Sequence, residues 1–370
     1  MAPRRDRHHD PRSERVDVRI SDPGEIAASL PALLGFRPRE PVVLISLTGS
    51  SSSGGRVGLT VRGDLPSPGD EAAAAAELVR SVRTDAPVAV LLAMVSEAPE
   101  VADSAGGWAA DGMTGLPHRG LVRELVVALT GDGIPVREAL LVRGGRWWSY
   151  DCPRACCAPG AGTPLPAGVT ALEAASVASG MVIEGDRSDL AARIAAPCGL
   201  GRGAMAAACV RVAAECSARV LAVGFDRVAQ ESWAAITAAA ARCRPGTVQA
   251  LSDREVARVA WGLRDRDVRD RALGLATGAD APAAEILWTE CTRRAPVPLD
   301  VAPATLLAVS AWLRGDGAMA NVSLTRALAG EPTYALARLL AQALATCVPP
   351  AELRAMITAA PAGPEPHRPE

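Results

Sequence analysis

The chain has 370 residues, enough for two domains of ordinary size. Hydrophobic residues make up 49% of it, which is ample for a buried core and excludes a mainly disordered protein. The formal net charge is only −2 at pH 7, so no strong field attracts nucleic acid or an anionic membrane surface. The chain contains Arg but no Lys, which excludes a Schiff-base lysine and a P-loop lysine.

The two ends of the chain and its cysteines predict a cytoplasmic protein. Residues 1–17 mix Arg and His with acidic residues, lack the apolar segment of a signal peptide, and predict a disordered tail. The Pro-rich residues 359–370 predict a second one. No apolar run reaches the roughly 18–20 residues that span a bilayer, so no membrane partner is expected. The nine Cys are an odd number, which favours reduced thiols in a bacterial cytosol.

Residues 18–150 alternate between helical and strand periodicity and predict an α/β domain. The first two strands are expected to form a hairpin across a Gly/Ser-rich turn. The next two strands flank a helix, and this order implies that they pair in parallel. The domain is therefore predicted to be a mixed sheet with flanking helices. The predicted strands are 42–47, 57–61, 88–95 and 134–142, and the predicted helices are 22–34, 70–84 and about 122–129.

The second half of the chain has a different character. Residues 151–168 form a loop rich in Cys, Pro and Gly, and residues 169–358 carry apolar stripes at helical spacing that predict an all-α domain. Within it, residues 304–337 match the offsets of one 34-residue tetratricopeptide repeat, which predicts a tetratricopeptide-like helical hairpin. Core packing is expected for the cysteines on apolar stripes, Cys209, Cys216, Cys243 and Cys291.

Cys152, Cys156 and Cys157 form the densest group of potential metal ligands. Three thiolates in one proline-rich loop could bind zinc, which prefers four nitrogen or sulfur ligands. His118 or Asp151 would have to supply the fourth ligand. The alternative is a turn whose thiols pack beside the neighbouring Trp and Tyr side chains, with no cofactor. The spacing differs from the C-x-x-C of thioredoxin-like proteins, which disfavours a redox role.

A second candidate site lies in the loop that follows the strand 88–95. In open α/β sheets, ligands bind beyond the carboxyl ends of parallel strands. Ser96 and Glu97 begin this loop, and His118 stands at the start of the next predicted helix, where it could act as a base with a lowered pKa. The alternative is a surface histidine at a helix start, because no nucleophile is paired with it in the sequence.

Three segments of the sequence are similar to those of a known family. The first is Ile20-Ser21-Asp22-Pro23-Gly24-Glu25 with Leu33-Leu34-Gly35-Phe36-Arg37-Pro38, the second is Arg146-Trp147-Trp148-Ser149-Tyr150 with the cysteine loop and Gly162-Thr163-Pro164, and the third is Ala311-Trp312-Leu313-Arg314-Gly315-Asp316-Gly317. In this order they resemble the bacterial domain-of-unknown-function 4192 family across nearly the whole chain between the tails. The resemblance implies no particular activity, cofactor or partner.

Two classes of function remain open. The lack of a complete catalytic constellation and the helical hairpin favour a binding or adaptor protein whose helical half contacts a protein partner. The alternative is an enzyme or small-molecule-binding protein with its ligand near Ser96, Glu97 and His118. The near-neutral charge disfavours nucleic-acid binding, which depends on phosphate contacts.

Overall fold

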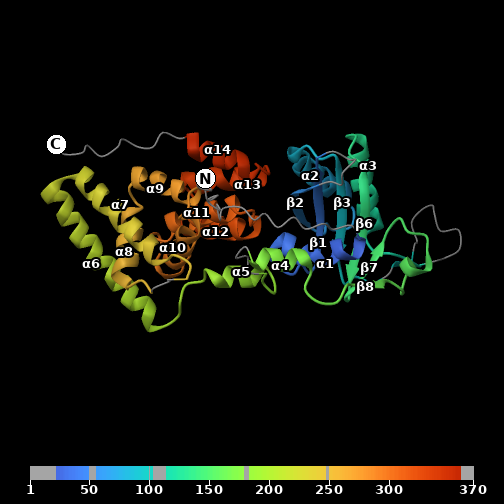
Figure 1. Ribbon diagram of the computed structural model, residues 1–370, viewed down its shortest axis with the longest axis horizontal. Helices are drawn as coiled ribbons and strands as arrows, with labels where there is room; N and C mark the ends of the chain where they lie inside the picture. Colours follow the sequence, from blue (N-terminus) through green and yellow to red (C-terminus); the bar gives the residue numbers. More distant parts are fainter. Residues whose placement is uncertain are drawn as a thin grey trace, which may run out of the picture.

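This computed structural model describes residues 22–49, 56–99, 101–102, 114–178, 183–246 and 250–359. Figure 1 shows a sheet with its helices at one end of the long axis and a group of helices at the other. An N-terminal mixed sheet followed by a largely helical half confirms the predicted fold class at this level. The predicted tail 1–17 lies outside the described residues, as does the predicted C-terminal tail apart from residue 359.

The sheet has six strands and mixed directions. β1 and β2 form the predicted antiparallel hairpin, and β3 and β6 form the predicted parallel pair. The remaining neighbours pair antiparallel, and the short last strand falls inside the predicted loop 151–168. In spatial order the strands are β2 (Arg56–Asp64), β1 (Pro41–Thr48), β3 (Ala89–Val95), β6 (Val136–Arg143), β7 (Arg146–Ser149) and β8 (Thr163–Pro164), and a separate ladder joins β4 (Val101–Ala102) to β5 (Thr114–Gly115).

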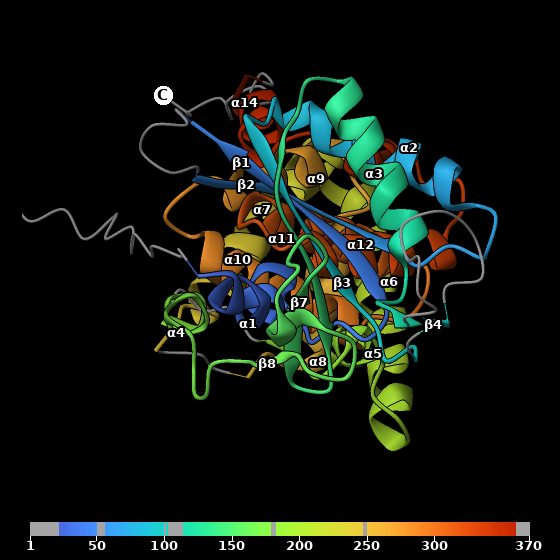
Figure 2. The ribbon, with the colours of Figure 1, turned by 90° about the vertical axis from the view of Figure 1, so that its right-hand side faces the viewer.

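Both faces of the sheet are covered (Figure 2). Val42 and Leu44 of β1 lie in one core cluster with residues of α2 (Glu71–Val82) and α3 (Arg119–Gly131). Val43 and Ile45 lie in a second cluster with residues of α1 (Pro23–Leu34). A strand that is buried on both faces needs apolar residues at every position, which explains the unbroken apolar run of β1.

Helix α1 begins and ends as its sequence predicts. The Asp22 carboxylate accepts the Gly24 N–H at 2.6 Å, and Pro23 follows this cap at the first helical position. At the other end, Gly35 takes the left-handed conformation at φ 78° and donates its N–H to the Pro31 carbonyl. Glycine adopts this conformation without a Cβ clash, and it therefore stops the helix.

The second half contains helices in the regions predicted from apolar stripes. Helix α11 is buried at all of its 13 residues and forms the centre of this half. The four cysteines predicted to pack in the core are buried. The helices are α4 (Ala171–Ala178), α5 (Arg187–Arg193), α6 (Leu200–Val223), α7 (Phe225–Arg242), α8 (Asp253–Gly262), α9 (Arg266–Leu273), α10 (Ala281–Arg294), α11 (Val301–Leu313), α12 (Gly317–Gly330), α13 (Ala335–Ala345) and α14 (Pro350–Ala359), with short 3-10 turns at Arg83–Asp85, Ala155–Cys157 and Gly274–Ala276.

The segment 304–337 folds largely into α11 and α12, which pack closely against each other. Its tetratricopeptide character is not confirmed. In a repeat array each helix pair leaves a surface exposed for binding. Helix α11 instead lies inside the helical half, so its small residues serve close packing within one core.

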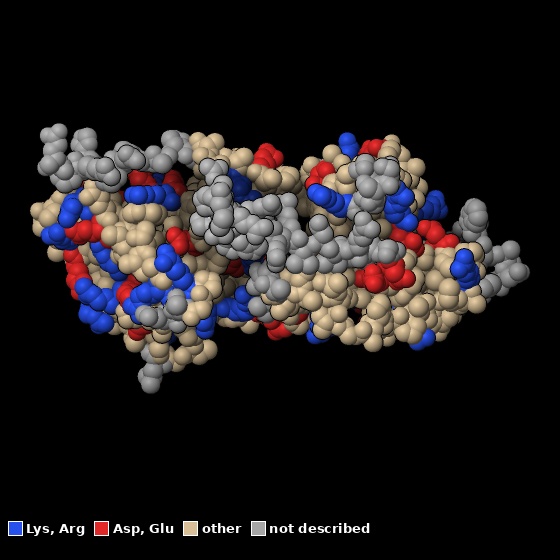
Figure 3. Space-filling view, in the orientation of Figure 1, with Lys and Arg blue, Asp and Glu red and all other residues tan. Residues whose placement is uncertain are grey.

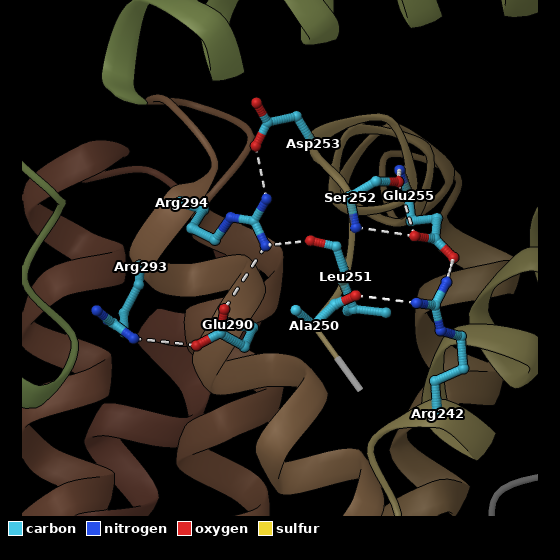
Figure 4. A network of polar contacts seen from close by, with 9 residues as sticks. All are labelled: Arg242, Ala250, Leu251, Ser252, Asp253, Glu255, Glu290, Arg293 and Arg294. Carbon is cyan, nitrogen blue, oxygen red and sulfur yellow. Dashed lines mark hydrogen bonds and ion pairs between the residues drawn. The ribbon is translucent and has the colours of Figure 1, made fainter. Parts of the chain in front are cut away.

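Polar side chains join three helices at the start of α8 (Figure 4). Arg294, at the end of α10, donates to the Leu251 carbonyl at 2.7 Å and to the Asp253 carboxylate at 2.5 Å. Arg242, at the end of α7, forms an ion pair with Glu255 of α8. These contacts hold the ends of α7 and α10 against the first turn of α8.

The two halves share one hydrophobic cluster. It includes Val43 and Ile45 of the sheet and continues to Trp288 and the buried residues of α11. An isolated parallel bridge between Phe36 and Glu184 also connects them. The division at residues 150 and 168 stays a prediction. None of the described helices combines the length and apolar character that crossing a bilayer requires.

Candidate functional site

Ser96 lies where β3 ends, at the carboxyl edge of the parallel strand pair. Its backbone N–H donates to the Val142 carbonyl of β6 at 3.2 Å, which continues the parallel ladder. The hydroxyl is fully buried; it donates to the Glu40 carboxylate at 2.6 Å and accepts the Ala98 N–H at 3.1 Å. Its partners therefore fix Ser96 in one orientation.

The imidazole of His118 joins this group. His118 Nε2 lies 2.9 Å from Ser96 Oγ. A serine hydroxyl carries one hydrogen, and the short contact to Glu40 uses it. The hydrogen between the two groups therefore belongs to Nε2, so His118 does not act as the base that activates Ser96. In the neutral ring this tautomer makes Nδ1 the acceptor.

The position and charge of His118 follow from its surroundings. Its backbone is left-handed at φ 60°, and the Tyr150 hydroxyl donates to the preceding Pro117 carbonyl at 2.7 Å. Burial lowers the pKa of His118, and the negative charge of Glu40 acts in the opposite direction with a smaller effect. The imidazole is consequently neutral at pH 7 and can accept a proton or a hydrogen bond.

Glu97, the third residue of the predicted ligand site, directs its backbone and its side chain to different partners. Its backbone N–H donates to Glu40 Oε1 at 2.8 Å, while its carboxylate accepts the Gly144 N–H at 3.1 Å in the turn between β6 and β7. The structure thus brings Ser96 and His118 together, while the Glu97 side chain points toward the turn between β6 and β7. Residue 100 and residues 103–113 of the predicted ligand loop lie outside the described residues.

Glu40 is the residue of this site that sequence reasoning missed. It directly precedes β1, which pairs antiparallel with β3, and Val42 lies opposite Met94. The start of β1 therefore lies beside the end of β3. An expectation that β1 and β3 pair antiparallel would have placed Glu40 beside Ser96. Together these residues can orient a polar ligand or move a proton at the imidazole.

The three loop cysteines also come together. Their sulfurs all lie within 4.8 Å of one another, and both Cys152 Sγ and Cys157 Sγ are 4.0 Å from Cys156 Sγ. Neither Asp151 nor His118 belongs to this group, so the structure does not supply the expected fourth ligand from either. The Cys157 side chain is buried, whereas Cys156 is exposed.

The cysteine loop is anchored on β7. The Ser149 N–H donates to Cys157 Sγ at 3.3 Å, and Trp148 Nε1 donates to the Ala158 carbonyl at 3.3 Å. Burial raises the pKa of Cys157 to about 11, while the Arg154 backbone N–H lowers the pKa of Cys152. Cys157 lies in one core cluster with Trp148 and Tyr150, and Cys152 packs against that cluster.

The three segments that resemble a family meet at α1. A Cβ on Gly24 would lie 2.8 Å from Trp147 Nε1, so the start of α1 packs directly against the central segment. A Cβ on Gly35 would lie 3.6 Å from the Asp316 carboxylate of the C-terminal segment. Asp316 in turn accepts the Met319 N–H at 2.9 Å and caps α12. These segments therefore include contacts that hold the fold together.

A groove opens between α6, α7 and α8 in the helical half, with a volume of about 490 Å³. We call it the α6–α8 groove. Leu221 and Phe225 line it and are 90% and 76% exposed. The indole N–H of Trp261, also in the lining, is buried and has no hydrogen-bond partner among the described residues. The apolar stripe of α6 is buried as far as Cys216 and reaches the surface at Val223, whereas Leu221 lies on another face of the helix.

The charges on the face drawn in Figure 3 do not indicate whether a partner would be acidic or basic. Acidic and basic side chains alternate over the helical half there. Several of them are paired with each other, as Arg219 is with Glu231 and Arg254 is with Glu215. On that face, the mixed charge therefore favours neither an acidic nor a basic partner.

No curated protein and no solved structure matches the chain. The family described as "Domain of unknown function (DUF4192)" matches residues 23–351. This range contains nearly all of the three segments quoted above, together with both the sheet and the helical half. The chain belongs to this family.

Proposed function

We propose that the protein is a binding protein whose α6–α8 groove receives an amphipathic helical segment of a partner protein. One observation carries the proposal: Leu221 and Phe225 are largely exposed beside a groove of about 490 Å³. Exposed apolar patches of this kind mark interaction surfaces in soluble chains.

The lining defines the chemistry of the partner. Val220 and Val228 extend the apolar floor between the helices, which suits the apolar face of a helix with anchors at i, i+3 or i+4, and i+7. At the rim, Asp265 is engaged in capping α9, while Arg264 is exposed and suits an acidic residue of the partner.

The test is photo-crosslinking in living cells of the protein's own host. A photoreactive amino acid replaces Leu221 in the full chain, and the control places it at Val127, an exposed apolar position (60%) on α3. We expect position 221 to crosslink to an amphipathic segment of another protein, and Phe225→Glu to abolish that crosslink. The same segment as a synthetic peptide should quench tryptophan fluorescence of the purified chain. Crosslinking to a second copy, or equal crosslinking at both positions, would overturn the proposal.

The edge of the sheet supports a second candidate function. Glu40, Ser96 and His118 form a connected hydrogen-bonded group at the carboxyl ends of β3 and β6, where α/β sheets bind ligands. We propose that His118 accepts a hydrogen bond or a proton from a small polar ligand, as a binding protein or an enzyme would require. Because Ser96 is buried and held by two partners, it supports His118 and is not a nucleophile.

Native mass spectrometry tests this second function. The purified chain should carry the added mass of an organic ligand, and His118→Ala should lose that mass while keeping the melting temperature of the ligand-free wild type. Arg123→Ala, an exposed change on the same helix, is the control and should retain the ligand. A bare wild-type chain, or a His118→Ala variant that melts below the ligand-free wild type, would leave His118 with a structural role only.

A further inference from the structure

We propose that Cys152, Cys156 and Cys157 together bind one Zn²⁺ ion, whose fourth coordination position is open to water. The site would lie in the loop between β7 and β8, and it involves no residue of the α6–α8 groove or of the Glu40–Ser96–His118 group. The proposal therefore stands or falls independently of both proposed functions.

The distances between the sulfurs carry the proposal. Two of the three pairs are 4.0 Å apart, and the third pair is within 4.8 Å. A tetrahedral zinc ion with Zn–S bonds of about 2.3 Å places its sulfurs roughly 3.8 Å apart. Small side-chain movements would therefore close the site around the ion. A disulfide would need two of the sulfurs to lie about 2.0 Å apart, and it would leave the third cysteine as a free thiol.

The surrounding backbone suits thiolate ligands. The Ser149 N–H donates to Cys157 Sγ at 3.3 Å, so one backbone donor faces the cluster. Donors of this kind offset the negative charge of metal-bound thiolates and orient them. Gly162 packs its Cα directly on the Trp148 ring, where a Cβ would lie 2.4 Å from the ring, and this contact fixes the far end of the loop.

The donor set selects the metal and leaves room for a fourth ligand. Thiolates favour zinc and other soft ions, whereas Mg²⁺ and Ca²⁺ require oxygen ligands. The cluster contains no fourth protein ligand among the described residues, and Cys156 is exposed, so water can reach the ion from that side. On binding, any protons still held by the three thiols are released to solvent as the Zn–S bonds form.

Cobalt(II) titration of the full, reduced chain tests the site, because Co²⁺ occupies zinc sites and absorbs visible light. We expect one equivalent to give the intense bands of tetrahedral thiolate coordination, and one equivalent of Zn²⁺ to bleach them. Cys156→Ser, at an exposed position, should weaken binding at least tenfold while the far-UV spectrum stays unchanged. Cys198→Ser, at another exposed cysteine, is the matched control and should bind as the wild type does.

A second variant and a mass measurement guard against a change in folding. Cys152→Ser should weaken binding as Cys156→Ser does, and native mass spectrometry should show the mass of one zinc ion in the wild type and in Cys198→Ser only. The proposal is overturned if the folded, reduced wild type shows no thiolate bands, or if Cys156→Ser and Cys198→Ser bind cobalt equally.

Discussion

The two halves use their polar side chains in opposite ways. In the sheet half, Glu40, Ser96 and His118 gather where strands end, and the loop cysteines gather beside β7. In the helical half, polar groups hold helices together, as Asp300 and Arg326 do. A polar cluster is therefore a useful indicator of a site in the first half. In the second half, the indicator is apolar surface that no helix covers.

Arg326 illustrates the structural use of charge. Its guanidinium forms an ion pair with the buried Asp300 at 3.1 Å and donates to the carbonyls of Ile194 at 2.5 Å and Thr292 at 2.8 Å. Burial raises the pKa of Asp300, and the positive charge of Arg326 acts against this. One side chain thus joins the end of α5, the end of α10 and the start of α11.

The largest effect on stability is expected from removing the Arg326 guanidinium. Arg326→Met should lower the free energy of unfolding by about 3–5 kcal/mol, because it leaves a buried carboxylate without its cation. Urea unfolding followed by circular dichroism measures the change. Arg293→Met, which removes a more exposed ion pair with Glu290, is the control and should cost less than about 1 kcal/mol. Equal losses in the two variants would contradict the contrast between buried and exposed pairs.

A smaller loss of stability is expected from removing the Asp85 carboxylate in the sheet half. Asp85 accepts the Ser46 hydroxyl at 2.5 Å and the Leu59 N–H at 2.8 Å, between β1 and β2. Asp85→Ala should cost about 1–3 kcal/mol, because Ser46 is buried and loses its acceptor. Asp85→Asn retains an acceptor oxygen and should cost less. An unchanged unfolding midpoint for Asp85→Ala would show that water replaces the carboxylate.

The cysteine loop offers a matched pair of glycines. Gly160 and Gly162 both have positive φ, at 76° and 67°, but a Cβ meets no atom within 4 Å at Gly160 and meets the Trp148 ring at Gly162. Gly160→Ala should cost about 1–2 kcal/mol from the backbone alone. Gly162→Ala should cost more and should also weaken Co²⁺ binding, since the loop must shift from the ring. If both variants unfold and bind alike, the ring contact does not position the loop.

The smallest effect concerns pH. Because burial lowers the pKa of His118, the unfolded chain takes up this proton near pH 6.5, at a higher pH than the folded chain does. The free energy of unfolding should therefore be largest above pH 6.5 and should fall as the pH is lowered toward the folded-state pKa. Urea unfolding at several pH values should show a shallower fall for His118→Gln. Parallel curves for the two proteins would mean that Glu40 cancels the effect of burial.

Much of the sheet half could be predicted because hydrophobic periodicity sets the direction of each side chain. The predicted strand 88–95 is β3, which begins at Ala89, and the predicted cap Asp22 begins α1. Strand neighbours were harder, because sequence alone does not give register. Glu40 was missed for this reason: its partner Ser96 lies 56 residues away and meets it only through the pairing of β1 with β3.

In the helical half, the sequence showed where helices lie but not which apolar residues stay exposed. Val212 and Leu221 belong to the same helix and are equally apolar, yet the first is buried and the second is largely exposed. Nine residues at roughly 100° each place them on opposite faces of α6, and which face the other helices cover is a property of packing. The clustering of the three loop cysteines, by contrast, was predictable, since Cys156 follows Cys152 by only four positions and Cys157 comes next.

The contacts of α1 join segments of the chain that the ribosome synthesises far apart in time. This helix emerges early from the ribosome, yet its end packs near Asp316, which follows Gly35 by roughly 280 residues and so emerges some 15–55 s later at typical synthesis rates. Until then the apolar residues Leu30 and Leu34 have no complete partner surface. The contacts of this helix with the sheet can form first, and its contacts with the C-terminal segment form only after the last third of the described chain has been made.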